Sequence, residues 1–270
     1  MKWNDLKGLE AKYLIGTTIS IPILLFAITY CINLGGYSSD FDSLGKLIIV
    51  MTLALFGVYG TIIFYSGLTL KQIGLTSKNV ILGIIYSAIL YIIFHTILFL
   101  LASEKVQSNE ESEMTLTFPS LPFNLIGYGI FLSVVWEEFV YRAFLLPQFQ
   151  ILFRKKGYRK SVILSIIITQ VIFALHHLGN RIFLQQMDFQ SILLDQISLI
   201  LIGTILCVIY ILTENLTYTI VVHLFMDFPI LFLTGIAIPT QFLTFMYFLV
   251  ALIGALIIKE FSHQHPEPIF

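Results

Sequence analysis

Long apolar stretches alternate with short polar connections along the whole chain. Runs of spanning length, about 20 residues each, fall at residues 13–34, 47–69, 80–102, 121–146, 161–178, 192–212, 217–236 and 240–258. Apolar residues are continuous within each run, and a backbone in lipid satisfies its hydrogen bonds only in helices or closed barrels. The pattern therefore predicts an all-α, polytopic membrane protein with about eight transmembrane helices.

Composition supports this prediction and excludes some partners. The 270 residues are 57% hydrophobic and only 11% charged, too apolar for a soluble domain of this length. A formal net charge of -1 gives no general attraction to nucleic acid, so no nucleic-acid partner is expected. Cys31 and Cys207 lie inside apolar runs without a CxxC motif, so the cysteines predict neither a disulfide framework nor a thiolate metal site.

The basic residues predict an orientation. Of the 15 Lys and Arg residues, eleven fall in segments on the side of the N-terminus, three fall on the opposite side, and Arg142 lies inside an apolar run. Because cytoplasmic loops carry an excess of Lys and Arg, both termini are expected in the cytoplasm of a cell-membrane protein. The acidic segment Ser103–Ser120 is then a solvated external loop. The segment Gly179–Ser191 suits an interfacial helix or a connector, and Asp195 is interpreted as an acid at a helix start.

Three ionisable residues interrupt the fourth apolar run, and such groups in a membrane are a functional-site hypothesis by default. Glu138 and Arg142 are four residues apart, a spacing that predicts an ion pair on one helix face. Glu137 is rotated from Glu138 by about 100 degrees, which leaves it available for chemistry. A buried ionic clip between helices is the alternative, but a clip leaves one glutamate unexplained.

Two later runs also carry polar groups. The fifth run ends in His176 and His177, and the seventh contains His223 and Asp227, again four apart and so on one face. Each insert alone is explained by interhelical hydrogen bonding. Three inserts of acid and base type are explained together by one catalytic cavity among the fourth, fifth and seventh helices.

Two hydrolytic mechanisms fit such a cavity. In one, Glu137 and a histidine activate water while the other His and Asp stabilise the oxyanion. In the other, a zinc ion is held by some of the candidate ligands. These candidates are Glu137, His177, His223 and Asp227. No HExxH motif is present, so the sequence is compatible with Zn2+ without requiring any cofactor.

The three inserts resemble a known family in order and spacing. Residues 137–142 match EExxxR, residues 173–177 match FxxxH, and residues 223–227 match HxxxN/D. Together they resemble the CPBP (CAAX prenyl protease and bacteriocin-processing, or Abi) family of intramembrane endopeptidases, over residues 121–228. The resemblance divides one membrane domain into accessory spans with an acidic loop (1–120), a catalytic core (121–236) and a last span with a tail (237–270).

The resemblance also implies roles for individual residues. Glu137 would activate water with His177, and Glu138 and Arg142 would support them. His223 and Asp227 would stabilise the oxyanion or act as further ligands. Asp227 stands where many family members have Asn, and a carboxylate donates a hydrogen bond only when protonated. This difference favours a ligand or histidine-orienting role for Asp227; His176 has no motif counterpart and is interpreted as structural.

The expected function is hydrolysis of a peptide bond in a membrane-associated substrate within the bilayer. A prenylated CAAX-type protein, a peptide and a bacteriocin-related precursor are all compatible, because specificity resides in cavity shape. Two alternatives stay open. One is a non-catalytic membrane protein for bacteriocin immunity or peptide binding, and the other is a proton-coupled transporter.

Overall fold

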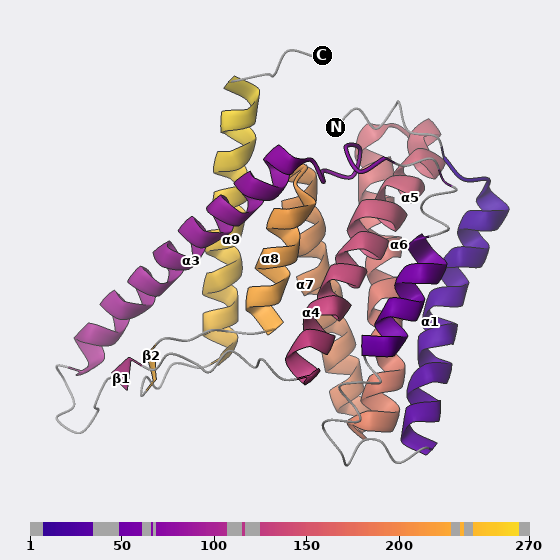
Figure 1. Ribbon diagram of the computed structural model, residues 1–270, viewed down its shortest axis with the longest axis horizontal. Coiled ribbons are helices and arrows are strands. Elements are labelled where there is room, and N and C mark those ends of the chain that lie inside the picture. Colours follow the sequence, from indigo (N-terminus) through magenta and orange to yellow (C-terminus); the bar gives the residue numbers. More distant parts are fainter. Residues whose placement is uncertain are drawn as a thin grey trace. The chain divides into compact units, whose positions relative to one another are not determined.

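The protein is described by a computed structural model, in which helices make up almost all of the described chain (Figure 1). The described residues are 8–34, 49–60, 66, 69–106, 115–116, 125–227, 233–234 and 240–264. Their helices are α1 (Ala11–Leu34), Ile49–Gly60, α3 (Ser77–Val106), α4 (Leu125–Glu137), α5 (Leu146–Phe153), α6 (Tyr158–Gly179), α7 (Phe189–Thr213), α8 (Leu216–Asp227) and α9 (Thr240–Gln264). Shorter segments are the π-helices η3 (Glu138–Leu145) and η5 (Asn180–Leu184) and the 3-10 turn η4 (Arg154–Lys156). The strands β1 (Thr115–Leu116) and β2 (Leu233–Thr234) form one antiparallel pair.

Every predicted apolar run contains a described helix. Among the described residues, five helical segments are long and apolar enough to cross a membrane. They are Ala11–Leu34, Ser77–Leu100, Tyr158–Leu184, Phe189–Thr213 and Phe242–Glu260. Two further apolar helices, Ile49–Gly60 and α8, are shorter. The prediction of an all-helical integral membrane protein is therefore confirmed, while the total of about eight crossings and the orientation of the termini stay predictions.

The chain divides into two compact units, each assembled from two stretches of sequence. Unit 1 comprises Met1–Gly74 and Pro122–Val208; unit 2 comprises Leu75–Leu121 and Ile209–Phe270. In unit 1, α1 and α5 both pack against α6. In unit 2, α3 packs against α8 and α9. The expected boundaries of the catalytic core at residues 121 and 236 stay a prediction.

Glycines allow the closest helix contacts inside each unit. A Cβ at Gly179 would meet the Phe26 backbone at 3.0 Å, so α6 approaches α1 only because this side chain is absent. In unit 2, a Cβ at Gly83 would meet the backbone nitrogen of Tyr218 at 2.9 Å. Small residues at such positions let helices associate by close packing, since lipid gives no hydrophobic driving force between them.

The fourth predicted run is longer and less regular than its hydropathy indicates. Three helical segments, α4, η3 and α5, follow one another without a break up to Phe153. The backbone N–H of Leu146 donates a hydrogen bond to the carbonyl of Tyr141, five residues earlier. A spacing of five residues is the hydrogen-bond pattern of a π-helix. Pro147 follows directly and has no N–H to donate, so η3 ends where the hydrogen-bond pattern must change. The motif from Glu138 to Arg142 thus lies on a π-helix, a conformation frequent at functional sites.

The connector between α6 and α7 is partly helical, and its contacts change the interpretation of Asp195. Its first half is η5, which continues α6, and Arg181 Nε there binds Asp195 Oδ2 of α7 at 2.8 Å. Asp195 therefore pairs across the connector and does not open the helix, which begins at Phe189. Asp188 accepts hydrogen bonds from Ser191 N at 3.0 Å and Ser191 Oγ at 2.7 Å, and these bonds lower the pKa of Asp188 below its ordinary value.

The predicted acidic loop is described only in part. Helix α3 extends into it as far as Val106, and β1 lies within it. Its other residues, 107–114 and 117–120, lie outside the described part of the chain.

Candidate active site

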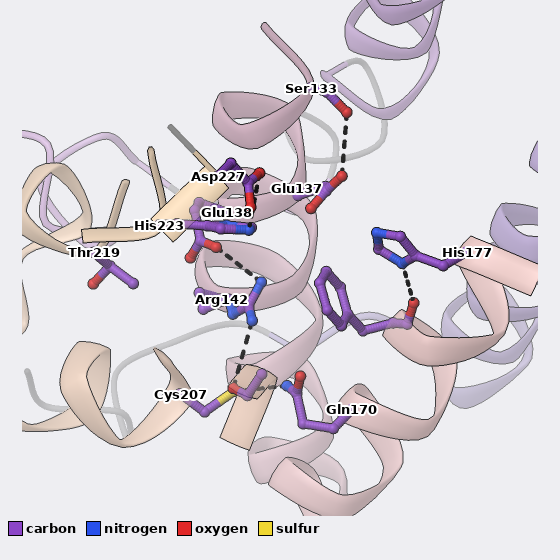
Figure 2. Close-up of polar contacts among 12 residues, drawn as sticks. Ser133, Glu137, Glu138, Arg142, Gln170, His177, Cys207, Thr219, His223 and Asp227 are labelled. Carbon is purple, nitrogen blue, oxygen red and sulfur yellow. Dashed lines mark hydrogen bonds and ion pairs between the residues drawn. The ribbon is translucent and has the colours of Figure 1, made fainter. Parts of the chain in front are cut away.

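Glu137 is the last residue of α4 and is 6% exposed. Its Oε1 accepts a hydrogen bond of 3.2 Å from Ser133 Oγ, one helical turn earlier. In Figure 2 the Glu137 side chain lies on the side of its helix that faces His177, whereas Glu138 lies on the other side. The two adjacent carboxylates therefore point in different directions, as their spacing predicts.

Glu138 and Arg142 form the predicted ion pair. Glu138 Oε1 lies 2.9 Å from Arg142 Nη1, and both side chains are fully buried. A buried charge that loses its partner is strongly destabilising, so each residue of such a pair requires the other. Glu138 therefore forms an ion pair within its own helix, and its role differs from that of Glu137.

Arg142 also joins this helix to two others in unit 1 (Figure 2). Its Nη2 donates to the Gly203 carbonyl of α7 at 3.5 Å, and its guanidinium carbon lies 4.7 Å from the centre of the Phe173 ring of α6. Beside it, Gln170 Nε2 donates to Cys207 Sγ at 2.8 Å. A Cβ on Gly203 would clash with the Gln170 amide oxygen, so α7 can approach Gln170 and Arg142 this closely only with glycine at this position.

The contacts of Arg142 with Gly203 and Phe173, and of Gln170 with Cys207, were not predicted from the sequence. Gln170 inside a predicted span and Gly203 inside another were the available signals, but neither spacing links them to Arg142. Their contacts depend on how α6 and α7 pack around η3, which no local pattern encodes.

His177 is oriented by a hydrogen bond within α6. Its Nδ1 lies 2.9 Å from the Phe173 carbonyl, four residues earlier. Because a carbonyl oxygen only accepts, Nδ1 donates, and the neutral ring then has its lone pair on Nε2. This tautomer presents a basic nitrogen at the end of the ring away from the backbone.

Glu137, His176 and His177 form a cluster that we call the Glu-His-His cluster. One ligand atom from each residue lies within 4.8 Å of the others. Glu137 and His177, assigned to one catalytic site from the sequence, thus lie near each other. His176, interpreted from the sequence as structural, also contributes an atom to the cluster. The centroids of the two histidine rings are 4.4 Å apart. Neighbouring residues on a helix point about 100 degrees apart, so rings this close were not expected.

His223 and Asp227 are described within unit 2. His223 Nε2 lies 3.7 Å from Asp227 Oδ2 on α8, so the predicted i,i+4 face is confirmed (Figure 2). His223 is buried, and the Asp227 side chain is 32% exposed. The expected cavity among three helices, and the metal set that includes His223 and Asp227, stay predictions.

One carboxylate and two imidazoles can serve two chemical purposes. A buried carboxylate beside a neutral imidazole can accept a proton from water. The same donors, two nitrogens and one oxygen, also match the His₂Glu ligand set of catalytic zinc sites. The described residues of unit 1 therefore contain groups that can activate water and groups that can hold a metal ion.

One comparison with known proteins matches part of the chain. Residues 118–229 match the family model described as Rce1-like, type II CAAX prenyl endopeptidase Rce1-like. This segment contains all three motifs, so the family resemblance predicted from them is confirmed. No curated protein and no solved structure matches the chain.

Proposed function

We propose, from the premise that residues 118–229 form an Rce1-like domain, that the chain is an intramembrane endopeptidase. Its substrate would be a prenylated CAAX-type protein at the membrane, in preference to a peptide or a bacteriocin-related precursor. The observation that carries the proposal is the Glu-His-His cluster, whose ligand atoms lie within 4.8 Å of one another. A buried carboxylate beside two imidazoles suits water activation better than a purely structural role.

In this mechanism Glu137 is the general base. Its carboxylate accepts a proton from water as the water oxygen attacks the scissile carbonyl, and it later gives the proton to the leaving amine. His177 Nε2 holds the water in line, because the bond from Nδ1 to the Phe173 carbonyl fixes the ring. Glu138 has a different role, because it forms the ion pair with Arg142 at 2.9 Å.

We assign His223 and Asp227 to the same reaction from their motif. A protonated His223 would donate to the oxyanion of the tetrahedral intermediate. Asp227 Oδ2, 3.7 Å from His223 Nε2, would orient this histidine and stabilise its charge. An orienting role suits a carboxylate better than direct donation to the oxyanion.

The cluster also fits a zinc ion. Glu137, His176 and His177 would hold it, and when bound it would supply a Lewis acid that polarises the scissile carbonyl. Metal analysis of purified protein separates the two mechanisms. Stoichiometric zinc that is lost in a His176→Gln variant would assign the cluster to metal; cleavage by zinc-free protein in chelator would assign the reaction to Glu137 and His177 alone.

Three variants test the proposal in membranes that contain a prenylated CAAX reporter. Glu137→Gln and His177→Gln should each lower cleavage by at least about a hundredfold, since each removes a proton-transfer group or its partner. His95→Gln is the matched control. Like His177, His95 on α3 has its Nδ1 within hydrogen-bond distance of the carbonyl four residues earlier, 2.9 Å from the Tyr91 oxygen. Full cleavage by the Glu137 variant would contradict the proposal.

A further inference from the structure

Positive charge is concentrated where α6 begins. Five basic residues fall within seven positions, on η4 and on the first turn of α6, and all five are exposed. They are Arg154, Lys155, Lys156, Arg159 and Lys160. None of the ion pairs among the described residues involves any of the five. Within the described part of the chain, no carboxylate neutralises this basic cluster, so its charge is available to an anionic partner outside the protein.

Two lysines of the cluster line a cavity. The cavity has a volume of about 450 Å³ and is open at the surface, and its described lining residues are Lys156, Lys160, Ile163 and Leu164. Sites for small molecules commonly have about 300–1,000 Å³. Lysine stems lie along apolar surface while the ammonium group stays in polar surroundings, so both residue types contribute to an apolar wall with charge at its edge. The cavity therefore suits a ligand that is anionic at one end and apolar at the other.

The lining residues follow one another along the helix in the order that such a ligand requires. Helix α6 begins a segment that is long and apolar enough to cross a membrane, and Lys160 lies in its first turn. Ile163 and Leu164 lie one turn further along, about 5–6 Å at 1.5 Å per residue. Ile167 and Val171 continue the face of Ile163 at four-residue intervals, and all three are exposed. Charge at the end of the span is thus followed by an exposed apolar face within it.

We propose that this cavity binds one anionic phospholipid. The phosphate lies at Lys156 and Lys160, and an acyl chain follows the exposed face of α6 from Ile163 onward. Basic residues next to a membrane span attract anionic lipids in general. The cavity adds an apolar wall beside two of the charges, which selects a single lipid position. The proposal does not depend on catalysis, because none of its residues belongs to the Glu-His-His cluster.

The same cavity does not suit the terminal carboxylate of a CAAX-type substrate. Lys160 and His177 are 17 residues apart on α6, which is about 25 Å along the helix at 1.5 Å per residue. A four-residue CAAX segment reaches at most about 14 Å when fully extended. A substrate whose scissile bond lies at His177 therefore cannot place its C-terminus at the lysines, whereas a lipid of the surrounding bilayer can occupy the cavity directly.

Lys155 and Arg159 provide a matched control. Both are exposed and belong to the same basic cluster, but neither lines the cavity. Lys156→Gln/Lys160→Gln and Lys155→Gln/Arg159→Gln each remove two positive charges from the same end of α6. Only the first double variant changes the cavity, so the pair of variants separates a lipid site from general attraction between charges.

Native mass spectrometry of the purified full-length chain, titrated with dioleoyl phosphatidylglycerol, tests the proposal. The wild type should bind one phosphatidylglycerol at least tenfold more tightly than dioleoyl phosphatidylcholine. Lys156→Gln/Lys160→Gln should lose at least tenfold in affinity for phosphatidylglycerol, and Lys155→Gln/Arg159→Gln should stay within about twofold of the wild type. Equal losses in the two double variants, or no preference over phosphatidylcholine, would overturn the proposal. Displacement of the lipid by an equal concentration of inorganic phosphate would overturn it too, because it would show a site for free phosphate.

A second variant tests the position of the acyl chain. Ile163→Ser should weaken phosphatidylglycerol binding at least threefold, because it removes apolar surface beside the lysines and keeps both charges. Ile253→Ser on α9 is the control, since Ile253 is also exposed and does not line the cavity. Thermal unfolding confirms that each variant is folded. Unchanged affinity in Ile163→Ser, or an equal loss in Ile253→Ser, would overturn the placement of the lipid on α6.

Discussion

Arg142 shows how one side chain organises the surroundings of the candidate site. It pairs with Glu138, donates to the Gly203 carbonyl and packs on the Phe173 ring. The pair itself lies within η3, and only Arg142 is shown to contact α6 and α7. A clip of all three groups between helices therefore stays an alternative. Glu137 lies beside the two histidines.

Replacement of Arg142 tests the energetic side of this arrangement. Arg142→Met leaves Glu138 buried without its cation and should lower the free energy of unfolding by about 3–5 kcal/mol. The double variant Glu138→Leu/Arg142→Met should recover most of the loss, because apolar residues of similar volume need no partner. Arg159→Ala, at an exposed position, is the control for loss of positive charge. Thermal unfolding in detergent measures all three.

No recovery in the double variant would contradict the assignment of Glu138 as the partner that Arg142 neutralises. Equal destabilisation by Arg159→Ala would attribute the effect to net charge instead.

Spacing alone predicted the contacts that arise within one helix. The pairs Glu138–Arg142 and His223–Asp227 are both present, because four residues bring side chains to one face even where η3 is π-helical. The same reasoning assigned His176 a structural role, because the side chains of neighbouring helix residues are expected to point in different directions. Ring packing against Trp136 and Tyr141 determines where His176 lies, and no helical spacing encodes that packing.

Helix α7 contributes to the site through the absence of a side chain. At Gly203 a Cβ would meet the Gln170 amide carbon at 2.9 Å and Arg142 Nη2 at 3.3 Å. Gln170 is fully buried, and its amide nitrogen donates a hydrogen bond to Cys207 Sγ, so the Gln170 side chain cannot simply move aside. The glycine is therefore a requirement of packing among η3, α6 and α7.

Gly203→Ala should destabilise the protein by about 1–3 kcal/mol, the usual cost of overpacking. Gly16→Ala on α1 is the matched control, because nothing lies within 4 Å of a Cβ there. This control should be neutral or stabilising by up to about 1 kcal/mol, since alanine favours helix over glycine. Denaturation midpoints of both variants measure the difference, and a neutral Gly203→Ala would contradict the close packing of α7.

Hydropathy predicted where helices occur but not their local form. The two π-helices, and the extension of the fourth run through α5 to Phe153, depend on hydrogen-bond register and on Pro147, which an average of hydrophobicity does not detect. The role of Asp195 was missed for a related reason. Its partner Arg181 lies 14 residues earlier, across a connector whose path the sequence does not specify.

The whole chain has five helical segments, among the described residues, that are long and apolar enough to cross a membrane, and its residues 118–229 match the Rce1-like family model. The fold class could be predicted because backbone hydrogen bonding in lipid leaves few options. Orientation, the number of crossings and the relation of accessory spans to the core depend on the membrane and on long-range packing, so they stay predictions. The transporter alternative and the non-catalytic immunity alternative make a different prediction. Under either one, neither the wild type nor Glu137→Gln cleaves a peptide bond.

The central claim is that Glu137 activates water for attack on a peptide bond. A single-turnover reaction of the reconstituted protein with a prenylated CAAX peptide in H₂¹⁸O, followed by mass spectrometry, tests it most directly. The account predicts one ¹⁸O atom in the new carboxylate of the product from the wild type, and no product from Glu137→Gln. A product that carries only ¹⁶O, or the same labelled product from Glu137→Gln, would contradict it.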